Sequence, residues 1–171
     1  MSFPHGLDEI VVEYGDPKLY LRADGTVHHA WESIILGTCV LPAELPLGWD
    51  EKTKVSRVRV HRKVVLSLGQ VFNDIHSAGL WPLLKTFDGA YAWRAKRGVK
   101  KLSTHCWGIA LDLNADTNQL GEKGDMPPEI VQAFLKHGWE WGGHWLSRPD
   151  SMHFKHAEAT KPVAEAGRKR G

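Results

Sequence analysis

The stretch that decides the fold is Ser103-Thr-His-Cys-Trp-Gly-Ile-Ala-Leu-Asp-Leu113. Its second half, residues 109–113, is an apolar run interrupted only by Asp112, and such a run predicts a short buried strand. A carboxylate inside an apolar strand is costly unless it is paired or bound to a metal ion. Asp112 therefore requires a partner. His105 is the nearest candidate, because Gly108 between them allows the chain to turn sharply.

Segments on either side of this strand alternate between helical and extended patterns. Residues 62–78 repeat apolar side chains at helical spacing up to Gly79, which predicts the main helix. A second helix is predicted over residues 128–137, after the Pro127-Pro128 pair and before Gly138. Further short strands are predicted at residues 83–87, 90–94, 139–141 and 152–156.

This order of elements predicts an α+β fold, with a small antiparallel sheet flanked by helices in a single domain. We expect residues 1–60 to form strands or an irregular cap that packs on a core of residues 61–160, followed by a basic tail at residues 161–171. The chain has 171 residues, enough for one hydrophobic core. Its two cysteines, Cys39 and Cys106, are too few for a disulfide framework.

Composition argues against two classes of partner. The formal net charge is +2 from 22 basic and 20 acidic residues, which disfavours nucleic-acid binding despite the basic residues within 57–63 and 94–101. No apolar run approaches the roughly 18 residues of a membrane span, and the first six residues lack the pattern of a secretory signal. We expect a monomer that is synthesised in the cytoplasm without a signal peptide and binds neither nucleic acid nor membrane.

A second group of polar residues follows the first by roughly forty positions. Two neutral imidazoles and one carboxylate are a typical ligand set for catalytic zinc, which keeps a fourth position for water. His153, on a predicted strand, completes such a set with His105 and Asp112. Asp150, three residues earlier, is placed to act as a general base toward that water, with Glu140 as the rival base.

Other residues near the motif are candidates for contacts with a substrate. Arg94 could stabilise an oxyanion or hold a substrate carboxylate, and Ser103 could orient substrate or simply cap a turn. Cys106 is either a thiolate or, as we favour, a small packed residue. Six of the eight tryptophans lie between residues 81 and 145, around the motifs, which suggests an aromatic-walled cleft. The substrate contacts that we predict are Ser103, Trp107, Tyr91 and His144.

These residues resemble a known family, the zinc D-Ala-D-Ala carboxypeptidases and L-alanyl-D-glutamate endopeptidases, which includes phage endolysins. The family pattern Ser-x-His-x-x-Gly-x-Ala-x-Asp matches the stretch from Ser103 to Asp112, and the later acidic-x-x-His pattern matches Asp150 and His153. The resemblance covers residues 62–156 and implies the fold of that metallopeptidase family. Departures at Cys106, His144 and Lys155 leave the substrate preference open.

The resemblance also implies an activity. It implies zinc on His105, Asp112 and His153, a catalytic carboxylate at Asp150, an electrostatic role for Arg94, and the stem peptide of peptidoglycan as substrate. We expect a bacteriolytic L-alanyl-D-glutamate endopeptidase of the endolysin type, acting on the cell wall after release by another protein. Two alternatives stay open: a D-alanyl-D-alanine carboxypeptidase or dipeptidase, and a catalytically silent zinc-containing module that binds peptidoglycan.

Overall fold

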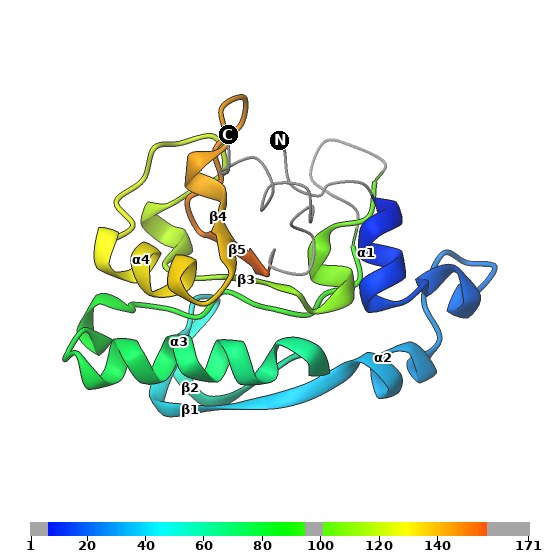
Figure 1. Ribbon diagram of the computed structural model, residues 1–171, viewed down its shortest axis with the longest axis horizontal. Helices are drawn as coiled ribbons and strands as arrows, with labels where there is room; N and C mark the ends of the chain where they lie inside the picture. Colours follow the sequence, from blue (N-terminus) through cyan, green and yellow to red (C-terminus); the bar gives the residue numbers. More distant parts are fainter. Residues whose placement is uncertain (1–6, 95–100, 157–171) are drawn as a thin grey trace, which may run out of the picture.

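Two small antiparallel sheets and the helices around them make up the computed structural model, which describes residues 7–94 and 101–156 (Figure 1). One sheet is a long hairpin of β1 (Leu36–Leu47) and β2 (Asp50–His61). The other sheet has the strand order β3-β5-β4 and joins segments that are far apart in the sequence. The structure therefore has the predicted α+β class, and the predicted basic tail lies outside the described residues.

The three-stranded sheet contains the predicted central strand. β3 (Ala110–Asp112) pairs antiparallel with β5 (His153–His156), which pairs on its other side with β4 (Trp139–Trp141). All three strands were predicted, with ends shifted by one residue at most. In this register Asp112 lies directly opposite His153, which brings together the two halves of the sequence motif.

Both predicted helices are present. α3 (Val65–Ser77) buries an apolar face and packs against β1 and α4, with Gly79 at φ +73° just beyond its end. α4 (Pro128–Lys136) follows Pro127 and packs against β4. Short 3-10 turns occur elsewhere, at Pro17–Tyr20, Arg62–Val64, Trp81–Leu83, Thr104–Trp107, Ala115–Thr117 and Gly142–His144.

The prediction of strands at residues 83–87 and 90–94 is wrong. Trp81–Leu83 is a 3-10 turn, and Phe87 makes only isolated bridges to Leu47 and Leu113. Because Phe87 bridges to a single residue on each side, no continuous ladder of hydrogen bonds forms along this segment. Its neighbour Asp88 donates its backbone N–H to the Asp112 carbonyl oxygen, at 2.9 Å.

The N-terminal sixty residues are more regular than predicted. They contain α1 (Leu7–Tyr14), α2 (His29–Ile35) and both strands of the hairpin. Buried side chains from this part join the same hydrophobic core as those of the three-stranded sheet. The indole of Trp31 donates to the carbonyl oxygen of Cys106 at 3.0 Å, so the N-terminal segment is hydrogen-bonded to the central motif itself.

Gly108 fits against the end of the hairpin in a way that only glycine allows. Its φ is +68°, its carbonyl oxygen accepts from the His61 N–H at 2.8 Å, and a Cβ built on it would lie 2.8 Å from the His61 nitrogen.

None of the described helices is long and apolar enough to cross a membrane.

We expect Gly108→Ala to destabilise the protein more than the same replacement does at another glycine with a positive φ. Gly25→Ala is the matched control, because Gly25 also has a positive φ but a Cβ there meets nothing within 4 Å. The control should cost about 1–2 kcal/mol of unfolding free energy, the usual strain of an L-residue in this conformation. Urea denaturation measures both; equal costs for the two variants would show that the contact with His61 is unimportant.

Candidate metal centre

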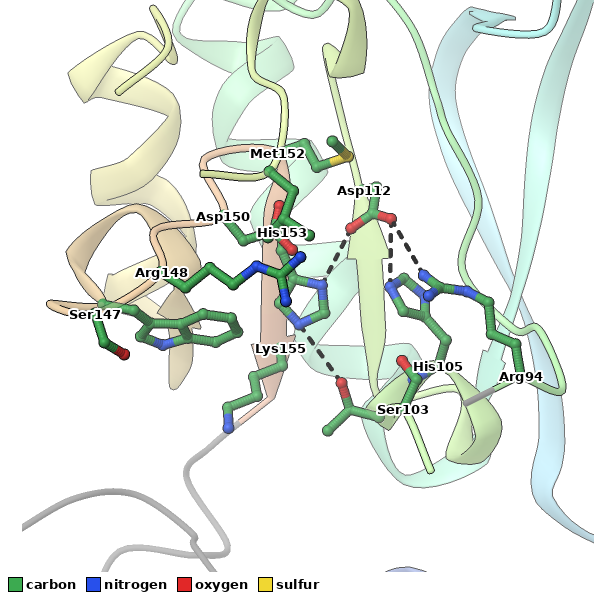
Figure 2. A pocket seen from close by; sticks show the side chains of 13 residues that line it. Arg94, Ser103, His105, Asp112, Ser147, Arg148, Asp150, Met152, His153 and Lys155 are labelled. Carbon is green, nitrogen blue, oxygen red and sulfur yellow. Dashed lines mark hydrogen bonds and ion pairs between the residues drawn. The ribbon is translucent and has the colours of Figure 1, made fainter. Parts of the chain in front are cut away.

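Three buried side chains from three different elements converge at one end of the three-stranded sheet (Figure 2). His105 comes from the 3-10 turn Thr104–Trp107, Asp112 from the end of β3 and His153 from the start of β5. The Nε2 atom of His105 lies 3.3 Å from Asp112 Oδ2, and the Nδ1 atom of His153 lies 3.1 Å from Asp112 Oδ1. One candidate ligand atom from each residue lies within 4.8 Å of the other two.

The hydrogen bonds of His105 fix its tautomer. Its Nδ1 lies 2.5 Å from the carbonyl oxygen of Ala90, and a carbonyl can only accept, so Nδ1 carries the proton and donates. The buried Nε2 is then unprotonated and makes no hydrogen bond to any described residue. A buried lone pair of this kind needs a positively charged partner or a donor, which a metal ion supplies.

His153 is held between two oxygen atoms. Its Nδ1 faces Asp112, while its Nε2 lies 3.5 Å from the Thr104 hydroxyl, at the limit of a hydrogen bond. Burial lowers the pKa of His153, although the Asp112 carboxylate acts in the opposite direction. The neutral form, which is the form that binds metal, is therefore favoured.

Asp112 is the anionic centre of the group. Burial raises the pKa of its carboxyl, but the interactions with the His105 and His153 imidazoles outweigh burial and hold the pKa far below its usual range. Backbone bonds fix the residue on both sides: its N–H donates to the Gly89 carbonyl oxygen, and its own carbonyl accepts from Asp88. The carboxylate is thus charged and rigidly placed.

The three residues fit a zinc ion. Zinc takes nitrogen and oxygen ligands at about 2.0–2.2 Å in tetrahedral geometry, which separates neighbouring ligand atoms by about 3.4 Å. Each imidazole nitrogen lies close to that distance from one of the two carboxylate oxygens: His105 Nε2 is 3.3 Å from Asp112 Oδ2, and His153 Nδ1 is 3.1 Å from Asp112 Oδ1. Two neutral imidazoles and one carboxylate leave a fourth position, as in catalytic zinc sites.

The group opens into a cavity of about 300 Å³, which we call the metal cavity. Asp150 lines it and lies close enough to His153 to raise the pKa of that imidazole by its charge. Its position depends on backbone bonds: the Asp150 N–H donates to the Gly142 carbonyl oxygen at 2.9 Å, and the Asp150 carbonyl accepts from His153 at 3.1 Å. The cavity therefore contains a carboxylate that is separate from the three candidate ligands.

Arg94 lines the metal cavity on the side of Asp112 (Figure 2). Its Nη2 lies 3.9 Å from Asp112 Oδ2. The backbone of Arg94 is held by Cys106, whose Sγ donates to the Arg94 carbonyl oxygen and accepts from the Arg94 N–H. Burial raises the pKa of the Cys106 thiol, so this cysteine is a protonated packing residue that positions the arginine.

The predicted substrate contacts do not all lie in the metal cavity. Ser103 lines the metal cavity, and its hydroxyl also caps the following turn by accepting from the His105 N–H at 3.3 Å. Trp107 is fully buried and donates its indole N–H to the Gly15 carbonyl oxygen, so it belongs to the core. Tyr91 is half-buried against the core and outside the described lining of the cavity.

His144 and Glu140 also lie away from the metal group. His144 lines a neighbouring cavity, where its ring contacts that of Trp141 at 4.8 Å between centroids. Glu140 on β4 accepts from the indole of Trp145 at 2.6 Å and lies 3.8 Å from Lys155. The structure thus brings Asp150, and not Glu140, to the lining of the metal cavity.

Sequence reasoning missed several residues that line the metal cavity. Arg148 and Lys155 add two cations, and the ring of Trp145 packs 5.4 Å from that of His153 between centroids. The Thr104 hydroxyl lies 3.5 Å from Nε2 of His153. Their nearness to the two motifs was one signal, and for Trp145 the predicted aromatic-walled cleft was another, but neither reveals the direction of a side chain.

A family model described as D-alanyl-D-alanine carboxypeptidase matches residues 97–156. That range includes all three candidate ligands and Asp150 but not Arg94 or the N-terminal hairpin. No curated protein and no solved structure gives a significant match to the chain.

Proposed function

We propose that this protein is a zinc-dependent peptidase that hydrolyses the stem peptides of peptidoglycan, as an L-alanyl-D-glutamate endopeptidase. The observation that carries the proposal is the meeting of His105, Asp112 and His153 at one buried point with the separate carboxylate of Asp150 in the same cavity. A binding module would need only the first three. The match to a D-alanyl-D-alanine carboxypeptidase family over residues 97–156 supports the substrate class.

The residues have distinct roles in this reaction. His105, Asp112 and His153 would hold the zinc ion, which when bound lowers the pKa of a water molecule and polarises the scissile carbonyl. Asp150 accepts the proton from the attacking water as its oxygen bonds to the carbonyl carbon. The same carboxyl then gives that proton to the amine as the carbon–nitrogen bond breaks, so proton and charge balance over the cycle.

Arg94 supplies positive charge beside the reacting carbonyl. Its guanidinium lines the cavity beside the metal ligands, where negative charge develops on the carbonyl oxygen when water adds. The contacts with Cys106 fix the backbone of Arg94 beside the cavity. Ser103 also lines this cavity, and its role in the proposal is to orient the peptide.

A second candidate is a D-alanyl-D-alanine carboxypeptidase. The description of the matching family favours it, and so do the cations Arg94, Arg148 and Lys155 in the cavity lining, because guanidinium and ammonium groups can bind a free terminal carboxylate. Both candidates use the same metal chemistry. They differ in whether the substrate continues beyond the scissile bond.

We expect the zinc-loaded protein to release new amino termini from purified peptidoglycan, and a chelator to stop the release. Mass spectrometry of the products distinguishes the candidates: new N-terminal D-glutamate identifies the endopeptidase, and free D-alanine the carboxypeptidase. Adding zinc back after removal of the chelator is the control for damage to the protein. Peptidoglycan that is bound but not cut would instead identify a silent binding module.

A further inference from the structure

A second cavity adjoins the metal cavity, and Trp145 lines both. It has a volume of about 520 Å³. Of the described residues that line it, none is acidic, whereas Lys123 and His144 are basic. The remaining lining is largely apolar or aromatic and consists of Gly124, Met126, Trp141, Gly143, Trp145, Leu146 and Pro149. The second cavity therefore extends the lined surface beyond the metal cavity, and its own charged side chains are basic, unlike those of the metal cavity, which include Asp112 and Asp150.

Trp145 is held between the cavities by a closed set of contacts. Its indole Nε1 donates to Glu140 Oε1 at 2.6 Å, while Lys155 lies 3.8 Å from Glu140 Oε2 and 5.6 Å from the centroid of the indole. Glu140 and Lys155 are directly opposite partners in the β4–β5 pairing. The sheet thus positions both residues, and they fix the ring of Trp145 beside His153.

Backbone hydrogen bonds link Trp145 to Asp150, the candidate base. The Gly142 carbonyl oxygen accepts from the N–H groups of both Trp145 and Asp150, at 3.1 and 2.9 Å. A Cβ at Gly142 would lie 2.5 Å from the Asp150 carbonyl oxygen, so the approach requires glycine. A contact between Trp145 and a substrate would therefore be made at a fixed position relative to Asp150.

We propose that the second cavity is a further substrate subsite, in which Trp145 contacts the peptide and Lys123 binds a carboxylate of the segment that flanks the scissile bond. The proposal rests on the proposed peptidase function. An extended peptide advances about 3.3 Å per residue, so neighbouring residues can lie on either side of one indole ring. Glu140 and Lys155 act as positioning residues, and an anionic segment suits a lining whose charged side chains are basic.

The first test is binding, measured by NMR on the ¹⁵N-labelled, zinc-loaded Asp150→Asn variant, in which turnover is expected to be about 10²–10⁴-fold slower. The probes are the peptide L-alanyl-D-glutamyl-L-lysine with the free α-carboxylate of its D-glutamate and the same peptide with that group amidated. The indole N–H signal of Trp145 is identified by its loss in Trp145→Phe. We expect the free peptide to shift this signal while that of Trp107, buried in the core, stays in place.

The carboxylate contact is tested by Lys123→Gln. Amidation should weaken binding about two- to fivefold, the usual range for a solvent-exposed ion pair, and Lys123→Gln should abolish this preference. A Trp145 signal that does not move, binding of neither peptide, or an undiminished preference in Lys123→Gln would overturn the subsite. The fate of the proposed function is decided separately, by the chelator-sensitive hydrolysis assay on the unaltered protein.

The positioning role of Glu140 is tested by two variants in the hydrolysis assay. Glu140→Gln retains an acceptor for the indole N–H, whereas Glu140→Ala does not. We expect Glu140→Ala to raise KM severalfold with a smaller change in kcat and to displace the Trp145 indole signal, and Glu140→Gln to restore both. A fall in kcat at unchanged KM in both variants would instead indicate a role in the chemistry and overturn the positioning role.

Discussion

Replacing Asp150 by asparagine is expected to lower kcat for peptide hydrolysis by about 10²–10⁴-fold, the usual contribution of general acid–base catalysis. Asparagine has nearly the same size but cannot accept the proton of the attacking water. The Gly142 and His153 bonds to residue 150 use only its backbone, so the substitution should leave the loop in place. Zinc content, measured by atomic absorption, should remain about one ion per chain, because the metal needs only the other three residues.

Glu140→Gln is the matched comparison for this experiment, since Glu140 is the other acid that the sequence offered as a base. Its carboxylate is engaged by Trp145 and Lys155, and it lies outside the described lining of the metal cavity. We expect kcat of Glu140→Gln to fall far less than that of Asp150→Asn. The reverse order would show that the base had been assigned to the wrong residue.

His105→Ala is expected to remove both the metal and the activity. Loss of an outer hydrogen-bond partner of a zinc ligand already weakens zinc binding 10- to 100-fold, so loss of the ligand itself should cost more than about 100-fold. Competition with a chromophoric chelator measures the affinity directly. Hydrolysis should fall below detection at zinc concentrations that saturate the unaltered protein.

His76→Ala controls for the removal of an imidazole as such. His76 is exposed near the end of α3, where its ring contacts Trp81 and no candidate ligand. This variant should bind zinc and cleave peptide as the unaltered protein does. If His105→Ala retained stoichiometric zinc and normal turnover, His105 would not be a ligand and the proposed centre would have to be redrawn.

The fold was predictable wherever apolar periodicity reports burial. The repeat that gave α3 and the apolar run that gave β3 each reflect a face turned toward one core. The hairpin was missed because the clearest apolar run near it, residues 34–36, lies at the junction of α2 and β1. The alternation Arg57-Val58-Arg59-Val60 does mark β2, but its charges suggested a basic patch more than a strand.

The candidate metal ligands could be predicted from the sequence, whereas most of the other residues that line the cavity could not. Asp112 stood out because a carboxylate in an apolar strand needs a partner, and the antiparallel register places His153 opposite it. The direction of an aromatic side chain carries no such signal. Trp107, inside the motif, turns into the core toward Gly15, whereas Trp145, outside both motifs, lines the cavity.

Because the Gly142 carbonyl oxygen accepts hydrogen bonds from both Trp145 and Asp150, the segment between these two residues can be exchanged as a unit. Residues 146–148 are exposed, and both ends of the segment are anchored on a single carbonyl oxygen. Exchanging residues 146–149 for other sequences of equal length would alter the rim of both cavities while the anchoring bonds keep residue 150 in register with β5. Such exchanges are therefore expected to alter the lining of both cavities without displacing Asp150, the proposed base.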